Sequence, residues 1–372
     1  MPMPSIDIAI VNYRGADDTL AALKRLGQWP HGTVWVVDNS AHEADVQAES
    51  AALRQACAAM PWVNLSAPGS NLGFGCACNL AFAQSSSDFF LLLNPDARIA
   101  PDAVLRLVDT LAENPRLGAV SPKIYWNEQH SFVLPTAFPQ TPWHSVALAL
   151  ATHFPRTTQS LVWRNLQRTM QQMAGPSWFE VPFLAGAVML LRRAAVMAAG
   201  GLFDPAYFMF FEDSDLSLRL RRANFALAVV PAISAVHAYQ HKASKAALMQ
   251  QSHSQYYSKQ FPAFYALSGQ WRGISALMRR PVPTARWGKV LEAPVASAAE
   301  FAQLSGACPV IALSPSPLMM PVMFRPDVGA ARCLDVQEWA LLEPAHYVAL
   351  VKNTDQPRGW TWVYFERAAL NS

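Results

Sequence analysis

The acidic side chains best placed to do chemistry lie in the segment GGLFDPAYFMFFEDSDLSLRLRR. Asp213 and Asp215 stand at the start of a predicted helix whose leucines would hold it against a core. A carboxylate in this position can take the proton from a hydroxyl that attacks an anomeric carbon. Both residues are therefore candidate general bases, and the residues alone leave the choice between them open.

Polar residues also follow the apolar runs of the N-terminal half, where the strands of a parallel sheet would end and ligands would bind. Asp38 can accept hydrogen bonds from ribose hydroxyls, and Tyr13 can lie against a base. Gly73 allows the backbone to approach a diphosphate, and the helix that follows offers free N–H groups. The candidate residues for nucleotide-sugar binding are Asn12, Tyr13, Asp38, Asn39, Asn71, Gly73, Asn79 and Asn94.

A diphosphate leaving group develops negative charge that a divalent cation neutralises well. We therefore expect Mg²⁺ or Mn²⁺ as cofactor, with Asp96 as a ligand. His237 ends the apolar run ISAV and is expected either to complete the metal coordination or to contact the diphosphate.

The elements that would position these residues alternate between short apolar strands and helical patterns. The runs IDIAIV, TVWVV and DFFLLL are the clearest strands, and their near-continuous apolarity indicates burial on both faces. The alternation predicts an α/β fold with a mostly parallel central sheet flanked by helices.

The order of patterns along the chain predicts one large domain and a small appendage. We expect the large domain over residues 1–280, including a variable acceptor-side insertion over 126–178. Residues 281–292, within RRPVPTARWGK and its flank, are a predicted linker. Residues 293–372 carry the strand-like pieces PVIALS, HYVALV and WTWVYF, and predict an α+β or β-rich accessory domain of open role.

The segment from Ile6 to about Tyr265 resembles glycosyltransferase family 2, a family with the GT-A fold, and within it the bacterial rhamnosyltransferase-like members. The matching pieces occur in the family's order: IVNYRG, VVDNS, NLGFGCACN, LLLNPDARI, FLAGAVMLLRR, GLFDPAYFMFFEDSDLSLRLRRANF and the strand ending at His237. The resemblance does not reach residues 293–372.

The resemblance implies a role for each matching position. Asp96 corresponds to the last carboxylate of the family's metal-binding motif, and Asn94 stands where many relatives have Asp. Asp213 corresponds to the catalytic base of the EDxD signature. The resemblance also implies nucleotide-sugar contacts for Gly186 and Glu212, which lie in two of the matching pieces. After His237 the chain reads AYQHKAS, so His241, Lys242 or Ser244 is expected to contact phosphate.

Composition excludes several other functions. The formal net charge is +3 and no run of Lys and Arg is present, so nucleic acid is not an expected partner. The most apolar later stretch ends at Arg192, well short of the ~18 residues that span a bilayer. We expect a cytoplasmic protein, with peripheral contact to the inner face of the cell membrane as the only membrane association. The cysteines show no metal-ligand spacing and are expected to be reduced.

Together these features predict an inverting transferase of rhamnose or another hexose. The expected donor is a dTDP- or UDP-linked sugar, and the acceptor a hydroxyl of a glycan or lipid-linked glycan in surface polysaccharide or lipopolysaccharide synthesis. A sugar nucleotidyltransferase would need a Gly-rich loop with Arg, which NYRGADD lacks. The remaining alternative is a catalytically degenerate nucleotide-sugar-binding or glycan-binding scaffold.

Overall fold

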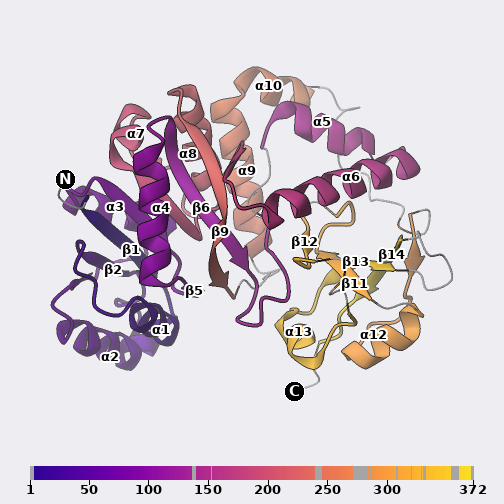
Figure 1. The fold of residues 1–372 in the computed structure, drawn as a ribbon, viewed down its shortest axis with the longest axis horizontal. Helices are drawn as coiled ribbons and strands as arrows, with labels where there is room; N and C mark the ends of the chain where they lie inside the picture. The colour runs from indigo at the N-terminus through magenta and orange to yellow at the C-terminus, as the bar shows by residue number, and fades with distance from the viewer. Residues whose placement is uncertain are drawn as a thin grey trace. The chain divides into compact units, whose positions relative to one another are not determined.

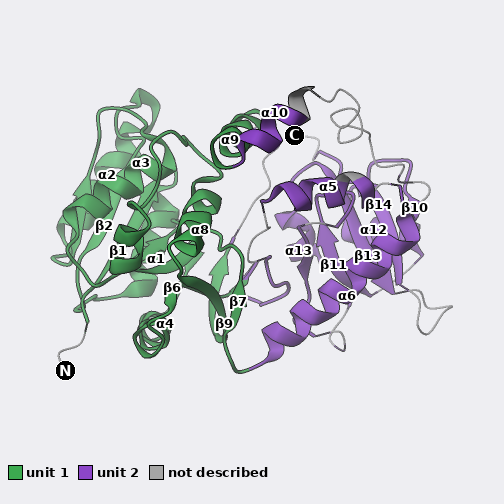
Figure 2. Cartoon of the chain, turned by 90° about the horizontal axis from the view of Figure 1, so that it is seen from above, with its two compact units in different colours: residues 1–124, 176–237, 247–260 green, residues 125–175, 238–246, 261–372 purple. Residues whose placement is uncertain are grey.

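The computed structural model describes residues 4–135, 140–151, 153–238, 245–270, 284, 287–306, 309–319, 321–327, 329, 332–352 and 360–369. The chain divides into two compact units, which Figure 2 colours separately. Unit 1 spans residues 1–124, 176–237 and 247–260, and unit 2 spans residues 125–175, 238–246 and 261–372.

Unit 1 is built on a mixed sheet whose central strands are buried. The strand order is β3-β2-β1-β4-β8-β6-β9-β5, and β7 pairs with β9 (Figure 1). The strands are β1 (Ile6–Asn12), β2 (Val34–Asp38), β3 (Val63–Ser66), β4 (Phe89–Leu93), β5 (Ala97–Arg98), β6 (Leu117–Tyr125), β7 (Phe179–Val181), β8 (Val188–Arg192) and β9 (Ala226–His237). β1 to β4 run parallel, whereas β8 is antiparallel to β4 and β6. The carboxyl ends of the parallel strands therefore lie on the side of the sheet where β8 begins. This side is called the carboxyl edge below.

Helices of unit 1 flank this sheet, and most of them contact its strands. They are α1 (Ala16–Leu26), α2 (Gln47–Ala58), α3 (Gly73–Gln84), α4 (Pro101–Glu113), α7 (Arg193–Ala198), α8 (Glu212–Arg222) and α9 (Ala246–Gln260), with a short 3₁₀ turn η1 (Ala44–Val46). α3 contacts β1 and β2, and α4 contacts β8 and β9. The runs IDIAIV, TVWVV and DFFLLL form β1, β2 and β4, so the predicted α/β class is confirmed.

Unit 2 contains a second sheet with the order β10-β14-β13-β11-β12. Its strands are β10 (Lys289–Val290), β11 (Val310–Ser314), β12 (Met323–Phe324), β13 (His346–Lys352) and β14 (Trp360–Glu366). Its helices are α5 (Pro142–Ala151), α6 (Pro155–Ala174), α10 (Pro262–Gln270), α12 (Ala298–Ser305) and α13 (Val336–Leu341). The three strand-like pieces predicted in this part of the chain form β11, β13 and β14.

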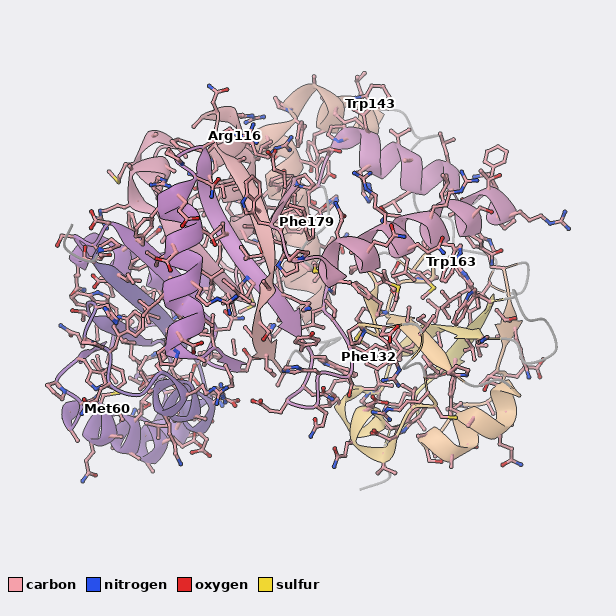
Figure 3. All side chains as sticks on the ribbon, in the orientation of Figure 1. Met60, Arg116, Phe132, Trp143, Trp163 and Phe179 are labelled. Atoms are coloured by element: carbon pink, nitrogen blue, oxygen red, sulfur yellow. The ribbon has the colours of Figure 1, made fainter. Side chains whose placement is uncertain are left out.

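The structure divides the chain differently from the prediction. The insertion after β6 belongs to unit 2, where Val133 bridges Phe324 of β12 and Trp163 of α6 packs on Trp360 with ring centroids 5.3 Å apart (Figure 3). The described end of the predicted linker is also part of unit 2, because Trp287 is buried against Trp362 and β10 pairs with β14. Nonlocal packing joins these segments, and local composition does not reveal it.

Two further expectations concern cysteines and membrane spans. Cys57, Cys76 and Cys78 are free, as predicted, whereas Cys333 is disulfide-bonded, so the expectation of reduced cysteines is wrong for Cys333. Sequence spacing does not reveal which cysteines folding brings together. Across the described helices, none has the length and apolar character to cross a bilayer.

Candidate active site

The last residues of β1 and β2 form a buried polar pair at the carboxyl edge of the unit 1 sheet. Asn12 and Asp38 are opposite each other in the parallel register, and Nδ2 of Asn12 donates to Oδ1 of Asp38 at 2.9 Å. The backbone and hydroxyl of Ser40 donate to the same oxygen at 3.1 and 2.9 Å. These three hydrogen bonds hold the Asp38 carboxylate in one orientation. The residue is only 1% exposed. Tyr13, the next residue after Asn12, is 44% exposed.

The start of α3 is fixed to the end of β2 and to a loop of unit 1. The side chain of Asn39 donates to the carbonyl of Gly73 at 3.0 Å, and Oδ1 of Asn71 accepts from the Gly73 N–H at 2.9 Å. Gly73 has a φ of +77°, and a Cβ there would lie 2.2 Å from the carbonyl oxygen of Phe208. This glycine therefore permits close approach of the 205–211 loop, a different use from the predicted approach to diphosphate.

Asn79, six residues further along α3, holds the backbone just before the 205–211 loop. Its Nδ2 donates to the Phe203 carbonyl at 2.8 Å, and its Oδ1 accepts from the Phe203 N–H at 2.9 Å. Both polar ends of the side chain are thus engaged with backbone. In this structure Asn79 fixes the backbone of Phe203, and the predicted nucleotide contact stays a prediction.

Asp96 and His237 meet beyond the end of β4. The turn after β4 leads into β5, which pairs Ala97 with His237 at the end of β9. Nε2 of His237 lies 3.1 Å from Oδ1 of Asp96 and 3.5 Å from Nδ2 of Asn94. Burial alone would raise the pKa of Asp96, but the hydrogen bond and charge of His237 outweigh it and the pKa lies below its ordinary value. The Asp96 carboxylate is therefore ionised at neutral pH.

Asp213 reaches the same edge of the sheet from α8. Its Oδ2 accepts from the N–H of Gly186 at 3.2 Å, and its Oδ1 accepts from the Ser214 N–H at 2.7 Å. Gly186 precedes Ala187, whose carbonyl accepts from the Asn94 N–H at 2.8 Å. The turn that carries Asp96 and the helix that carries Asp213 are thereby linked through a few residues of backbone.

Glu212, the first acidic residue of α8, is buried and one of its carboxyl oxygens lacks a hydrogen-bond partner among the described residues. The residue is 6% exposed, and the oxygen in question is Oε2. Burial, with a further contribution from the charge of Asp213, raises the pKa of Glu212 to about 8. Burial also raises the pKa of Asp213, although hydrogen bonds from Gly186 and Ser214 oppose that shift. Both carboxyl groups therefore bind protons more tightly than ordinary acids.

Asp215 has a different environment from Asp213, which favours Asp213 as the base, although the choice between them stays a prediction. It is fully buried, and its Oδ2 accepts from Nε of Arg219 at 2.6 Å. Its Oδ1 accepts from Nε2 of Gln260 at 2.6 Å. The guanidinium of Arg219 also donates to carbonyls at the end of α7, among them Gly201 at 2.7 Å. Asp215 is therefore an internal anchor of α8, since its spacing of two residues from Asp213 turns it toward the core.

The backbone immediately before α8 adopts an unusual conformation. Phe210 and Phe211 have φ values of +69° and +67°, a left-handed region that bulky residues rarely occupy. Contacts from α9 stabilise this strained conformation. The hydroxyl of Ser252 donates to the Met209 carbonyl at 2.6 Å, and the Tyr256 ring lies 5.5 Å from that of Phe211. Such strain concentrates at functional sites, and here it directs the first turn of α8.

The structure thus gathers most of the predicted residues at one edge of a single unit. Sequence reasoning assigned no role to Ser40, which orients Asp38, and missed the Arg219 interactions that distinguish Asp215 from Asp213. The serine of VVDNS was the available signal for the first, and the i,i+4 spacing of Asp215 and Arg219 for the second. His241, Lys242 and Ser244 lie outside the described residues. Within the described ranges, no group of three or more His, Cys, Asp or Glu side chains forms a ready metal site.

The unit 1 sheet has polar residues at its carboxyl edge, and α8 brings Glu212 and Asp213 to the same edge. This arrangement is that of a glycosyltransferase with the GT-A α/β fold. Residues 2–258 match the profile described as "Glycosyltransferase like family 2". The chain therefore belongs to glycosyltransferase family 2. The match ends near the end of α9, so it covers unit 1 and the insertion.

Two curated relatives are rhamnosyltransferases. An N-acetylglucosaminyl-diphospho-decaprenol L-rhamnosyltransferase of Mycobacterium tuberculosis is 32% identical over 227 residues, which cover 57% of this chain and 70% of that protein. Rhamnosyltransferase WbbL of Escherichia coli is 28% identical over 183 residues, which cover 46% of this chain and 63% of WbbL. These similarities agree with the bacterial rhamnosyltransferase-like resemblance.

Solved structures with a similar fold were also found. Mannosyltransferase PcManGT from Pyrobaculum calidifontis, in complex with GDP-Man and Mn²⁺, aligns with a TM-score of 0.48 and 15% identity, covering 74% of this chain and 72% of that one. GalNAc-T7 with UDP, GalNAc and Mn²⁺ aligns with a TM-score of 0.45 and 13% identity, covering 74% and 54%.

Proposed function

We propose that this glycosyltransferase is inverting and moves rhamnose or another hexose from a dTDP- or UDP-linked donor to a hydroxyl of a lipid-linked glycan. Surface polysaccharide or lipopolysaccharide synthesis is the process it would serve. The observation that carries the proposal is the Asp213 carboxylate, held by the Gly186 N–H at the edge where the polar strand ends converge. Both rhamnosyltransferase relatives support the choice of sugar, and the name of the Mycobacterium tuberculosis relative supports a lipid-linked acceptor.

Asp213 is the proposed general base. Its carboxylate would take the proton from the acceptor hydroxyl while that oxygen forms a bond to the anomeric carbon. The bond from the anomeric carbon to the diphosphate breaks at the same time, so the nucleoside diphosphate leaves with the electron pair. A single direct displacement inverts the anomeric configuration. The raised pKa of Asp213 supports this role, because a more basic carboxylate accepts a proton more readily.

Asp38 and Tyr13 are the proposed nucleoside contacts. The hydrogen bonds to Asp38 from Asn12 and Ser40 all end on Oδ1, so its other oxygen is available in the described structure to accept from ribose or base. Tyr13 exposes a ring beside it for stacking. Because hydrogen bonds from Asn12 and Ser40 already fix Asp38, the nucleotide sugar would bind with little loss of side-chain freedom at this residue.

The residues at the end of β4 fit a divalent cation. Asp96 provides an ionised carboxylate and His237 an imidazole nitrogen 3.1 Å from it, so two groups of the kind that bind Mn²⁺ already face each other. Nε2 of His237 and Oδ1 of Asp96 would be the protein's ligands. When bound, the cation would neutralise the charge that develops on the leaving diphosphate. The side chain of Asn94 borders the same place, since its Nδ2 lies 3.5 Å from Nε2 of His237.

A donor screen scored by nucleoside diphosphate release tests the proposal. We expect turnover with a dTDP- or UDP-linked hexose, a lipid-linked glycan acceptor and Mn²⁺ or Mg²⁺, and a product whose anomeric configuration is opposite to that of the donor. Product stereochemistry is read by proton NMR. Retention of configuration would overturn the assignment of Asp213 as a simple base.

Isothermal titration separates the enzyme from the alternative, a degenerate binding or scaffold protein. The scaffold would bind a nucleotide sugar and release no nucleoside diphosphate with any acceptor offered. A lipid-linked acceptor also implies peripheral contact with a membrane. The inner face of the cell membrane is the location we propose for that contact, because nucleotide sugars are cytoplasmic donors.

A further inference from the structure

Unit 2 contains a cavity of about 670 Å³ that plays no part in the proposed chemistry. It lies between the two helices of the insertion and the strand β12, and its walls are mainly apolar: Leu148 and Ala151 come from α5, Val162 and Leu166 from α6, and Phe324 from β12. Its volume is within the range of roughly 300–1,000 Å³ that small-molecule sites occupy. A ligand for this cavity must therefore be largely hydrocarbon.

The cavity opens on a surface that is unusually apolar. Leu150, Phe154 and Leu161 belong to its lining, and they are 48%, 60% and 58% exposed. Trp143, at the start of α5, is 83% exposed (Figure 3). Four large apolar side chains thus face solvent within nineteen residues, where an ordinary surface would scatter them singly.

The charge of the same segment is exclusively positive. From residue 129 to residue 179 the sequence contains arginines but no lysine, aspartate or glutamate. The arginines are Arg156, Arg164 and Arg168, all on α6 and all exposed. Leu161, Arg164 and Arg168 are spaced three and four residues apart, so they share one face of the helix. An exposed apolar patch bordered by cations is complementary to an anionic lipid surface.

We propose that the α5–α6 hairpin of unit 2 docks on an anionic phospholipid bilayer and takes one lipid hydrocarbon chain into its cavity. Trp143, Leu150, Phe154 and Leu161 enter the interface between headgroups and chains, and the arginines of α6 contact the phosphates. This inference specifies the surface that makes the membrane contact included in the proposed function. It does not rest on the transfer chemistry of unit 1.

Vesicle flotation with the full chain tests the docking. We expect binding to phosphatidylglycerol vesicles that contain no sugar acceptor, and much weaker binding to phosphatidylcholine vesicles. The triple variant Arg156→Gln, Arg164→Gln, Arg168→Gln should lose roughly 100-fold in affinity for the anionic vesicles, because each cation near such a surface contributes about one kcal/mol. A matched triple variant at exposed arginines of unit 1, Arg25→Gln, Arg54→Gln, Arg221→Gln, should bind as the wild type does.

A second pair of variants tests the apolar contribution. Phe154→Ser and Leu161→Ser should each weaken binding to phosphatidylglycerol vesicles about tenfold or more. Val336→Ser, which removes another exposed apolar side chain of unit 2, should leave binding unchanged. Circular dichroism and the unfolding midpoint of each variant show whether the fold is retained.

Binding of cis-parinaric acid, a fluorescent fatty acid, tests the cavity itself. We expect one molecule bound per chain in the wild type, and much weaker binding in Ala151→Trp, where the indole projects into the cavity and takes the place of part of the ligand. Leu148→Trp serves as a second filling variant in case the first does not fold, and Ala51→Trp on an exposed face of α2 is the control.

Three results would overturn the proposal. The first is equal affinity of the wild type and the triple arginine variant of α6 for anionic vesicles. The second is binding only to vesicles that contain a lipid-linked glycan, which would assign the contact to the acceptor and not to the bilayer. The third is fatty-acid binding that keeps its wild-type affinity in both filling variants in folded protein. Failure of donor turnover would affect only the proposed function, because these readouts require no turnover.

Discussion

The backbone N–H of Gly186 donates a 3.2 Å hydrogen bond to Oδ2 of Asp213, across 27 residues of sequence. Gly186 stands two residues before β8, so its position is set by the central sheet. The proposed base is consequently positioned by the sheet as well as by its own helix. Its partner Ser214 fixes the other oxygen, which leaves the carboxylate a single orientation.

Asp213→Asn should reduce turnover by about 10²–10⁴-fold, because the amide cannot accept the proton of the acceptor hydroxyl. Donor affinity should change little, since the amide has nearly the shape of the carboxyl group. Release of nucleoside diphosphate measures the first effect, and calorimetry measures the second. Asp109→Asn, an exposed change on α4, should have wild-type turnover. Full activity of Asp213→Asn would remove the residue from the mechanism.

Asp215→Ala should lower the free energy of unfolding by about 3–5 kcal/mol, because it leaves the Arg219 guanidinium without its buried partner. Urea unfolding at neutral pH measures this loss. Asp45→Ala removes an exposed carboxylate that pairs with Arg14 and should have little effect on the free energy of unfolding, because solvent screens such pairs. A small effect of the Asp215 change would mean that the ion pair is not an anchor of α8.

Glu212 should make the protein less stable as pH rises. Its pKa is raised in the folded state from 4.5 to about 8, so between these values the native protein keeps a proton that the unfolded chain has lost. The free energy of unfolding therefore falls as pH increases through this window and levels off above it. Glu212→Gln should lose this part of the pH dependence. Unfolding curves of both proteins from pH 5 to pH 9 measure the difference, and parallel profiles would contradict the assignment.

Gly73→Ala should destabilise the protein by at least about 1 kcal/mol, because a left-handed φ disfavours any side chain. The added Cβ would also displace the Phe208 carbonyl, which it would approach to 2.2 Å. Because the 205–211 loop leads into α8, turnover should fall as well. Gly69→Ala is the matched control, since nothing lies within 4 Å of its Cβ and its φ is not left-handed. Thermal unfolding and donor turnover of the two variants distinguish the sites.

Asp96→Asn should raise the Mn²⁺ concentration needed for half-maximal turnover by at least about tenfold, because it removes the carboxylate ligand. Mn²⁺ binding in the presence of a nucleoside diphosphate, followed by electron paramagnetic resonance, provides a readout independent of activity. Asp102→Asn, on the exposed first turn of α4, should leave both values unchanged. Unaltered Mn²⁺ binding by Asp96→Asn would place the cation elsewhere.

The strands and the polar residues at their ends were accessible from sequence because local patterns carry that information. Continuous apolarity predicts β1, β2 and β4, and a parallel sheet necessarily brings Asn12, Asp38 and Asp96 to one edge. The difference between Asp213 and Asp215 was not accessible. It depends on Gly186, Arg219 and other partners distant in the chain, and no period of the sequence reports which carboxylate they contact.

The extent of unit 2 was equally inaccessible. The insertion after β6 reads as an irregular stretch rich in Trp and Pro, yet it forms α5 and α6 and packs with strands that lie more than a hundred residues later. α6 does carry a helical period, since Thr158, Val162, Leu166, Met170 and Met173 are buried at spacings of four and three residues. The scattered Pro, Trp and His residues around it hid that period in the sequence analysis. Contacts such as Trp163 on Trp360 are decided only when the chain folds.

The two phenylalanines that precede α8 in left-handed conformation depend on α9 for support. α9, which has no part in the proposed chemistry, thus supports the loop that leads to the proposed base Asp213. Substitutions at Ser252 or Tyr256 would let the loop relax and swing Asp213 away from an otherwise intact set of neighbours. A change in α9 could consequently alter turnover while leaving every residue of the proposed site unchanged.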